Sequence, residues 1–258
     1  MRAAWYAEWL KLRRSRLIWM TLLAVTVGAA AAGLFMFISL HPGKARDLGL
    51  LGAKAQLATL DPTWPSYFGL LAQITAVGGV LFFGMTMVWV FGREFAGHTV
   101  KDLLALPTSR AATVTAKFAA ATGWSLALTG YLSAAGTGIG LLLGIPGPLS
   151  GQVLADGGMK VAVTALLTIA ITTLFGFGAS TGRGYLSGVG VLFAILFTAQ
   201  IVAALGYGAW FPFAVPALHA GITGDQSPAP AGYVGVAAVA AGSIWLTIRW
   251  WQRADHTR

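Results

Sequence analysis

The stretch YFGLLAQITAVGGVLFFGMTMVWVF, residues 67–91, carries no charged side chain in 25 consecutive positions. A helix rises about 1.5 Å per residue, so about 20 apolar residues cross a hydrocarbon core of roughly 30 Å. A helix is the expected structure, because an open sheet edge would leave unpaired backbone groups in lipid. This stretch therefore predicts a helix that spans a membrane.

Five more apolar runs lie on either side of this stretch, separated by short loops that contain basic residues. The six predicted spans are Leu17–Leu40, Tyr67–Phe91, Phe118–Ile145, Val161–Thr181, Tyr185–Gly206 and Tyr233–Ile248. The first run is too long for the apolar core of a cleaved signal peptide, so we expect it to be retained. Charged residues make up 10% of the chain, against about 25% in an average soluble domain. The sequence predicts an all-α polytopic integral membrane protein with one transmembrane domain over residues 1–258.

The distribution of charge predicts the orientation of this domain. Of the 17 Lys and Arg residues, 13 lie in the N-terminal segment, the loops after the second and fourth spans, and the C-terminal tail. The remaining four, on the other side, are Lys44, Arg46, Lys54 and Lys160. Basic loops favour the cytoplasm, so both termini are expected there, in the cell membrane. The net charge of +9 is thus explained by membrane topology, and a nucleic-acid partner is not expected.

Residues 207–231 contain an apolar stretch, Trp210–Ile222, that could be counted as a seventh span. Pro212 and Pro216 argue against a continuous helix there, because each removes a backbone donor that lipid cannot replace. A seventh span would also place the basic C-terminus outside. We therefore predict an external re-entrant or interfacial hairpin before the sixth span.

Residues 1–16 predict an amphipathic helix that lies in the headgroup region. Trp5, Trp9 and Leu12 recur at helical spacing, with Lys11 and Arg14 on the opposite side. An ordinary basic flank anchored by interfacial tryptophans is the alternative interpretation.

The loop GREFAGHTVKDLLALPTSRAATVTAK, residues 92–117, is the one sizeable predicted cytoplasmic loop. Thr99 can cap a short helix, for which Val100, Leu103, Leu104 and Leu106 form an apolar face and Pro107 the end. Such a helix suits docking into a groove on another protein, and equally packing on its own spans.

This loop resembles the signature of the type-2 ABC exporter permeases. The matching positions are Glu94, Thr99, Leu103, Leu104, Pro107, Arg110 and Lys117. The N-terminal AEWLKLRRSR, residues 7–16, is similar to the start of small permeases in the bacitracin-export and lantibiotic-immunity branch. One position departs from the pattern: the family's glycine before the threonine is His98 here, which concerns the local turn geometry.

The resemblance implies that the loop holds a coupling helix, seated in a cleft of a separate ATP-binding subunit, and that residues 1–16 form the connecting helix. It also implies two ATP-binding subunits, which bind ATP and Mg, and a second permease subunit, either a second copy in a homodimer or a similar permease. An amphipathic cargo, such as a drug, an antibiotic peptide or a lipid-like molecule, would pass through a central cavity. Residues suited to line that pathway are Phe82, Phe83, Met85, Met87, Trp89, Phe193, Phe197 and Gln200, although ordinary core and lipid packing is the favoured interpretation for most of them individually.

Enzymatic chemistry is not expected of this chain. A phosphate-binding loop needs GxxxxGK followed by Ser or Thr, and no such run is present. The four histidines lie in different loops without a second ligand at helical spacing, so no metal site is predicted. The alternatives to an ATP-driven exporter are an ion- or proton-coupled transporter and a non-transporting membrane partner. The predicted span interiors hold no acidic residue, which weighs against the ion-coupled alternative.

Overall fold

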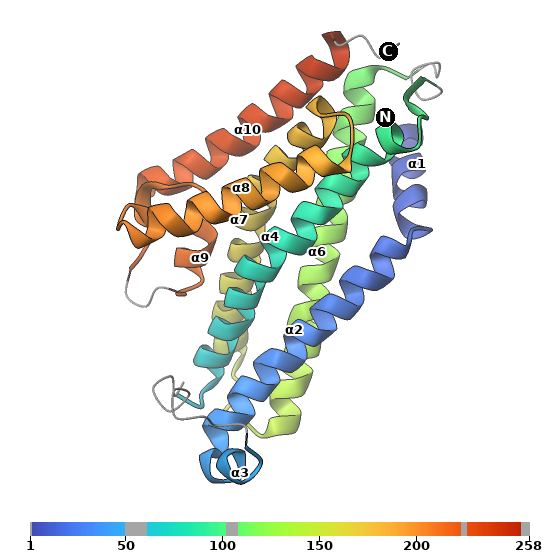
Figure 1. Cartoon of the computed structure of the whole chain (residues 1–258). Helices are drawn as coiled ribbons and strands as arrows, with labels where there is room; N and C mark the ends of the chain where they lie inside the picture. The colour runs from blue at the N-terminus through green and yellow to red at the C-terminus, as the bar shows by residue number, and fades with distance from the viewer. Residues whose placement is uncertain (1, 50–60, 102–107, 223–225, 254–258) are drawn as a thin grey trace.

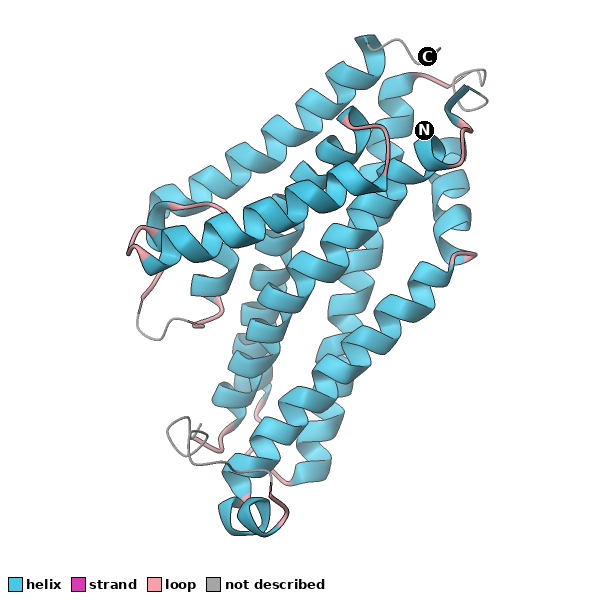
Figure 2. Cartoon of the chain, viewed as in Figure 1, coloured by secondary structure: helices cyan, strands magenta, loops and turns pink. Residues whose placement is uncertain are grey.

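The computed structural model describes residues 2–49, 61–101, 108–222 and 226–253. In this part of the chain the secondary structure consists of helices joined by loops, without strands (Figure 2). In chain order the helices are α1 (Arg2–Arg13), α2 (Arg16–Leu40), α3 (Pro42–Asp47), α4 (Trp64–Ala96), α6 (Arg110–Leu143), α7 (Gly151–Thr181), α8 (Tyr185–Ala204), the 3₁₀ helix η2 (Gly208–Trp210), α9 (Val215–His219) and α10 (Pro230–Arg253).

Six of these helices, α2, α4, α6, α7, α8 and α10, are long and apolar enough to cross a membrane. They confirm the predicted number of spans. Several are longer than predicted: α7 begins ten residues before Val161, and α4 continues five residues beyond Phe91. Hydropathy marks where a chain leaves the hydrocarbon, whereas backbone hydrogen bonding lets the helix continue into the headgroup region and beyond.

Local sequence explains where these helices begin and end. The Ser109 and Ser150 hydroxyls accept hydrogen bonds from the backbone N–H of Ala112 and Val153, which caps α6 and α7. Gly144 ends α6 in the left-handed conformation, with φ +66°. Threonine hydroxyls inside the spans donate to carbonyls one turn earlier, as Thr75 does to Leu71 at 2.8 Å, so they do not need water.

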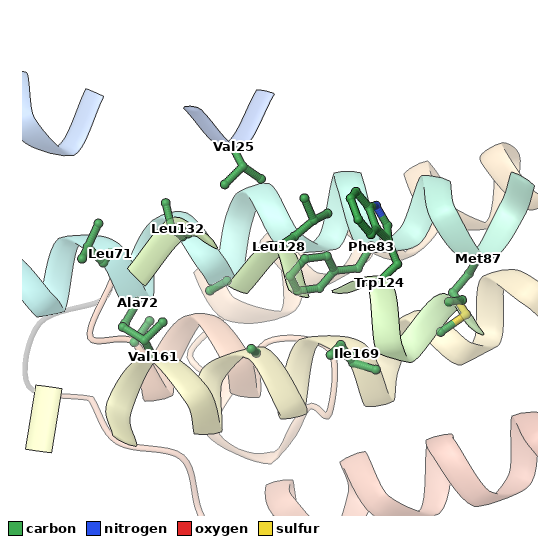
Figure 3. Close-up of a cluster of buried hydrophobic side chains, with 14 of the residues drawn as sticks. Val25, Leu71, Ala72, Phe83, Met87, Trp124, Leu128, Leu132, Val161 and Ile169 are labelled. Atoms are coloured by element: carbon green, nitrogen blue, oxygen red, sulfur yellow. The ribbon is translucent and has the colours of Figure 1, made fainter. Parts of the chain in front are cut away.

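The core lies between α4 and α7, which pack together most extensively, and α6 and α2 cover one side of this pair. Figure 3 shows part of it, with labelled side chains from α2, α4, α6 and α7 gathered in one cluster: Val25, Leu71, Ala72, Phe83, Met87, Trp124, Leu128, Leu132, Val161 and Ile169. Gly157 of α7 meets the ring of Phe68 so closely that a Cβ would overlap it. This small residue therefore sets how near α4 and α7 approach.

The two ends of the bundle differ. Figure 1 shows α1, the end of α4, the start of α6 and the end of α10 together at the top of the view, and α3 with the starts of α4 and α7 at the bottom. The grouping at the top agrees with the common side predicted for both termini and for the loop after the second span.

The segment before α10 folds back against the bundle instead of extending through it. Figure 1 shows α9 partway along α4 and α7, and Gln73 Nε2 of α4 donates to the Gly221 carbonyl at 3.3 Å. Val215 is fully buried and packs with Ile171 of α7. Pro216 lies in the first turn of the short helix α9, where the N–H that proline lacks would have no partner within the helix.

Candidate functional site

The loop between α4 and α6 begins with a tight turn. The α4 helix ends at Ala96, and the Thr99 N–H donates to the Glu94 carbonyl at 2.9 Å. His98 adopts φ +54°, a left-handed conformation that favours glycine. The departure from the family pattern therefore falls on a left-handed position, which glycine would adopt with less strain than His98 does.

A helix begins again directly after Thr99, since Val100 and Lys101 are helical and Val100 is buried. This start agrees with the position of the predicted coupling helix. Leu103, Leu104 and Pro107 lie outside the described residues, together with the rest of the segment 102–107. The coupling helix therefore stays a prediction. The structure describes the chain on either side of it, up to Lys101 and from Thr108 onward.

A cluster of four charged side chains lies at the base of this loop, and we call it the charge cluster: Glu8, Lys11, Glu94 and Lys117. Lys117 Nζ lies 2.7 Å from Glu94 Oε2 and 3.0 Å from Glu8 Oε2, and it donates to the Val90 carbonyl at 2.9 Å. Lys11 Nζ lies 2.6 Å from Glu8 Oε1 and 3.1 Å from Glu94 Oε1. Each carboxylate thus bridges both ammonium groups.

The cluster is almost closed to solvent. Lys117 is 0% exposed, Glu94 2% and Glu8 4%, whereas Lys11 is 30% exposed at the rim. Within the cluster two positive and two negative charges balance, which is the condition under which charged groups tolerate burial. At its edge, Arg93 Nε lies 4.0 Å from Glu94 Oε1. Burial opposes the charge of Lys11, but the attraction of Glu8 and Glu94 outweighs it, so the pKa of Lys11 is raised.

The cluster joins three elements that are far apart in the sequence. Glu8 and Lys11 come from α1, Glu94 from the last turns of α4, and Lys117 from the third turn of α6. Glu94 and Lys117 stand at the two ends of the loop, so both ends are tied to α1. The predicted coupling residues Glu94 and Lys117 are therefore brought together, but inside the bundle and away from its surface.

Arg110, another predicted coupling residue, holds the end of the last helix. Its guanidinium Nη1 donates to the backbone carbonyls of Trp251 at 3.1 Å and Gln252 at 3.2 Å. Trp251 is fully buried, and its ring centroid lies 5.6 Å from that of Phe95. The base of the loop is thus linked to α10 as well as to α1.

Sequence reasoning missed Glu8 and expected Lys11 on the polar side of a helix lying on the membrane. In the structure Lys11 is paired with Glu94 at the edge of the bundle and Arg14 is exposed, while Leu12 of the predicted apolar side is fully buried and Trp5 is 46% exposed. One signal in the sequence could have shown it. Glu8 is the only acidic residue before Asp47, in a segment otherwise basic and suited to anionic headgroups. An acidic residue in that position indicates that it pairs with a basic residue inside the protein.

The residues predicted to line a pathway do not meet at one place. Phe82 and Phe83 line a cavity of about 320 Å³ between α2, α4 and α6. Gln200 lines another, of about 150 Å³, between α4, α8 and the segment before α10. Met87 is fully buried in the core, and Met85 is 41% exposed.

The remaining aromatic candidates lie on outer surfaces of this subunit. Phe193 and Phe197 of α8 are 48% and 64% exposed, with ring centroids 6.5 Å apart. Trp89 is half-buried, and the Arg93 guanidinium lies 4.5 Å from its ring centroid. In the part of the chain that the structure describes, no group of three His, Asp or Glu side chains could hold a metal ion.

Residues 5–200 match the family described as ABC-2 family transporter protein. The bacitracin transport permease protein BCRB of Bacillus licheniformis is 25% identical over 181 residues, which cover 69% of this chain and 85% of that protein. The family match begins within α1 and ends within α8. It therefore contains all four members of the charge cluster and the loop that they support.

Proposed function

The chain belongs to the ABC-2 transporter family, in the branch of the bacitracin-export permeases, and on that premise we propose that it is the membrane subunit through which ATP hydrolysis drives export of an amphipathic cargo. Family and fold together make it a multi-pass membrane subunit of an ABC transporter. ATP and Mg would bind on a separate ATP-binding subunit, since no phosphate-binding loop occurs in this sequence.

The charge cluster is the observation that supports this proposal most directly. In our proposal the segment Thr99–Leu106 is the coupling helix that docks on the ATP-binding subunit. Any displacement of that helix acts on Glu94 and Lys117, the two residues from which the loop extends. Separating one partner of a buried ion pair costs about 3–5 kcal/mol, so these residues move together with α1 instead of parting.

The cluster would convert a local movement into a movement of several spans. Lys117 is bonded to α4 through Glu94 and the Val90 carbonyl, and to α1 through Glu8. Arg110 adds α10, through the Trp251 and Gln252 carbonyls. Closure of the ATP-binding subunits would in this way act on α1, α4, α6 and α10 together, and through the close packing of α4 and α10 on α7 it would tilt the subunit as one body. Alternating access needs such a rigid displacement.

Orientation and assembly follow from the same premise. We propose that the loop end of the bundle is cytoplasmic, as the distribution of basic residues predicts, and that residues 207–231 lie in the outer leaflet. We further propose a homodimer of this subunit with two ATP-binding subunits. Six spans are too few to enclose a pathway alone, and α8 presents a largely exposed apolar face beside the Gln200 cavity.

The cargo is proposed by analogy with the relative, whose name assigns bacitracin transport to that protein. An antibiotic peptide of this kind is amphipathic, and the two cavities on either side of α4 are lined almost wholly by apolar side chains. An outward direction would remove such a molecule from the membrane before it acts.

The test is to purify the tagged chain with its ATP-binding subunit from membranes of its host and to reconstitute the complex in proteoliposomes. We expect uptake of fluorescent bacitracin by the population whose ATP-binding subunits face the medium, only when ATP and Mg are added. Vesicles with the complex but without ATP, under an imposed proton gradient, are the control. Uptake that follows the gradient and ignores ATP would replace this proposal by the ion-coupled alternative.

A further inference from the structure

A second polar group lies far from the charge cluster, where α7 meets the segment before α10. Lys160 Nζ of α7 lies 3.6 Å from the point that a Cβ on Gly221 would occupy, and Gly221 has φ +83°. Gln73 of α4 donates to the Gly221 carbonyl at 3.3 Å. Two residues earlier, His219 Nδ1 and the Tyr233 hydroxyl share a hydrogen bond of 2.8 Å. Lys160 of α7 and Gln73 of α4 thus meet at Gly221, and His219, bonded to Tyr233 of α10, lies two residues before it in the chain.

The charge of this group is not balanced. Among the described residues no carboxylate lies within ion-pair distance of Lys160, and its ammonium makes no hydrogen bond. Asp156, one turn earlier on α7, is exposed and does not pair with it. Burial and the charge of Lys160 lower the pKa of His219, so that ring is neutral at neutral pH. A half-buried cation at a membrane interface without a counter-ion favours an anionic occupant.

An apolar cavity adjoins the group. Its volume is about 150 Å³, and Ile222, the residue after Gly221, forms part of its wall. Ala76 and Val77, one turn beyond Gln73 on α4, form another part, and α8 closes it with Ala199 and Gln200. A cation and an amide donor meet at Gly221, and Gly221 and Gln73 lie within about one helical turn of the cavity lining along the chain. This arrangement matches a molecule with an anionic head and an apolar tail.

We propose that Lys160, assisted by the second amide N–H of Gln73, binds the phosphate head group of an amphipathic molecule whose apolar part enters this cavity. Lysine acts as a point charge toward phosphate, and the amide supplies a directed donor. If the occupant is the cargo, this inference deepens the proposed function and rests on it. A membrane phospholipid that supports the structure has the same chemistry and is the other source.

The test measures binding to the full chain alone, in detergent without added lipid. Dioctanoyl phosphatidic acid is titrated against wild type and Lys160→Gln by isothermal calorimetry. The expected loss is roughly fivefold to tenfold in affinity, as for one basic residue at an anionic headgroup. Lys160→Arg should retain the affinity, and so should Lys44→Gln, which removes an exposed basic residue of α3. Equal affinities of wild type and Lys160→Gln, both folded as judged by thermal melting, overturn the proposal.

Further variants test the tail and the counter-ion. Ala199→Phe fills the cavity from α8 and should weaken phosphatidic acid binding, whereas inorganic phosphate should bind weakly to every variant. Inorganic phosphate that displaces the lipid at equal concentration contradicts an amphipathic ligand. Asp225 lies outside the described residues, and Asp225→Asn should leave the affinity unchanged. A marked gain in that variant identifies Asp225 as the partner of Lys160 and overturns the site.

The two sources of ligand are separated with the ATP-binding subunit present. Stimulation of ATP hydrolysis by dioctanoyl phosphatidic acid in wild type, but not in Lys160→Gln, indicates cargo. Binding without stimulation indicates a structural lipid. Binding is measured on the chain alone, so a positive result remains valid even if the complex shows no ATP-driven transport. Failure of this site and failure of the proposed function are therefore distinguishable.

Discussion

Lys117 is fully buried, and two carboxylates and one carbonyl surround its ammonium group. A buried ion pair adds little to stability when compared with an apolar pair of the same size, but removal of one partner leaves an unpaired charge. Because of this asymmetry, separating one ion pair of the charge cluster costs free energy even though the cluster adds little to stability. The helices α1, α4 and α6 therefore stay connected when the loop is displaced.

A charge-removal cycle tests this at residue scale. Lys117→Met leaves Glu8 and Glu94 with Lys11 as their close cation and with Arg93 4.0 Å from Glu94, so we expect a loss of about 3–5 kcal/mol in the free energy of unfolding, measured by denaturation in mixed micelles. The double variant Glu94→Gln/Lys117→Met keeps the Glu8–Lys11 pair at 2.6 Å and should lose less than the single variant. A single variant as stable as wild type would show that the cluster is not a constraint.

At the scale of helices, the close approach of α4 and α7 depends on Gly157 next to Phe68. Apolar side chains of both helices belong to one buried cluster, to which α4 contributes Leu71, Ala72, Phe83 and Met87 and α7 contributes Val161 and Ile169 (Figure 3). The neighbouring Gly158 faces open space, where a Cβ would meet nothing within 4 Å. Two adjacent glycines of one helix thus have opposite roles, and one serves as a control for the other.

We expect Gly157→Ala to destabilise the chain by about 1–3 kcal/mol, because the new methyl group must displace the Phe68 ring. Gly158→Ala should be neutral, or stabilising by up to about 1 kcal/mol, since alanine favours a helix more than glycine does. Both are measured by thermal melting of the purified protein in one detergent. Equal melting temperatures of the two variants would contradict the packing described here.

The segment before α10 can be tested by cysteine labelling, since the chain contains no cysteine. Tyr207→Cys and Ser227→Cys, at exposed positions on either side of α9, should both react with an impermeant reagent in intact cells. Val215→Cys, which is fully buried, should react slowly, and Ser109→Cys should react only after permeabilisation. Labelling of Ser109→Cys in intact cells, or of Ser227→Cys only from inside, would reverse the orientation or add a span.

At the scale of the whole molecule, the six spans could be predicted because about 20 apolar residues in a row have few alternatives in a membrane protein. The charge cluster could not, since Lys117 lies 109 residues from Glu8 and 23 from Glu94, and pairing at such distances depends on how helices pack. No acidic residue lies inside the predicted spans. Glu94 lies three residues beyond the predicted second span, in the last turn of α4, where Lys117 and Lys11 pair with it. The sequence also predicted several helix ends inaccurately, because hydropathy does not indicate where backbone hydrogen bonding stops.

The central claim is that the loop between α4 and α6 connects this subunit to an ATP-binding subunit. The most direct measurement is the amount of that subunit, and its ATP hydrolysis, recovered with tagged Leu103→Asp and Leu104→Asp from membranes. A charge in the docking face would be desolvated without a partner, at a cost of several kcal/mol. We predict normal membrane insertion with loss of co-purification or of cargo-stimulated hydrolysis, whereas Leu48→Asp, an exposed position at the opposite end of the bundle, should behave as wild type. Full recovery and full activity in both loop variants would contradict the account.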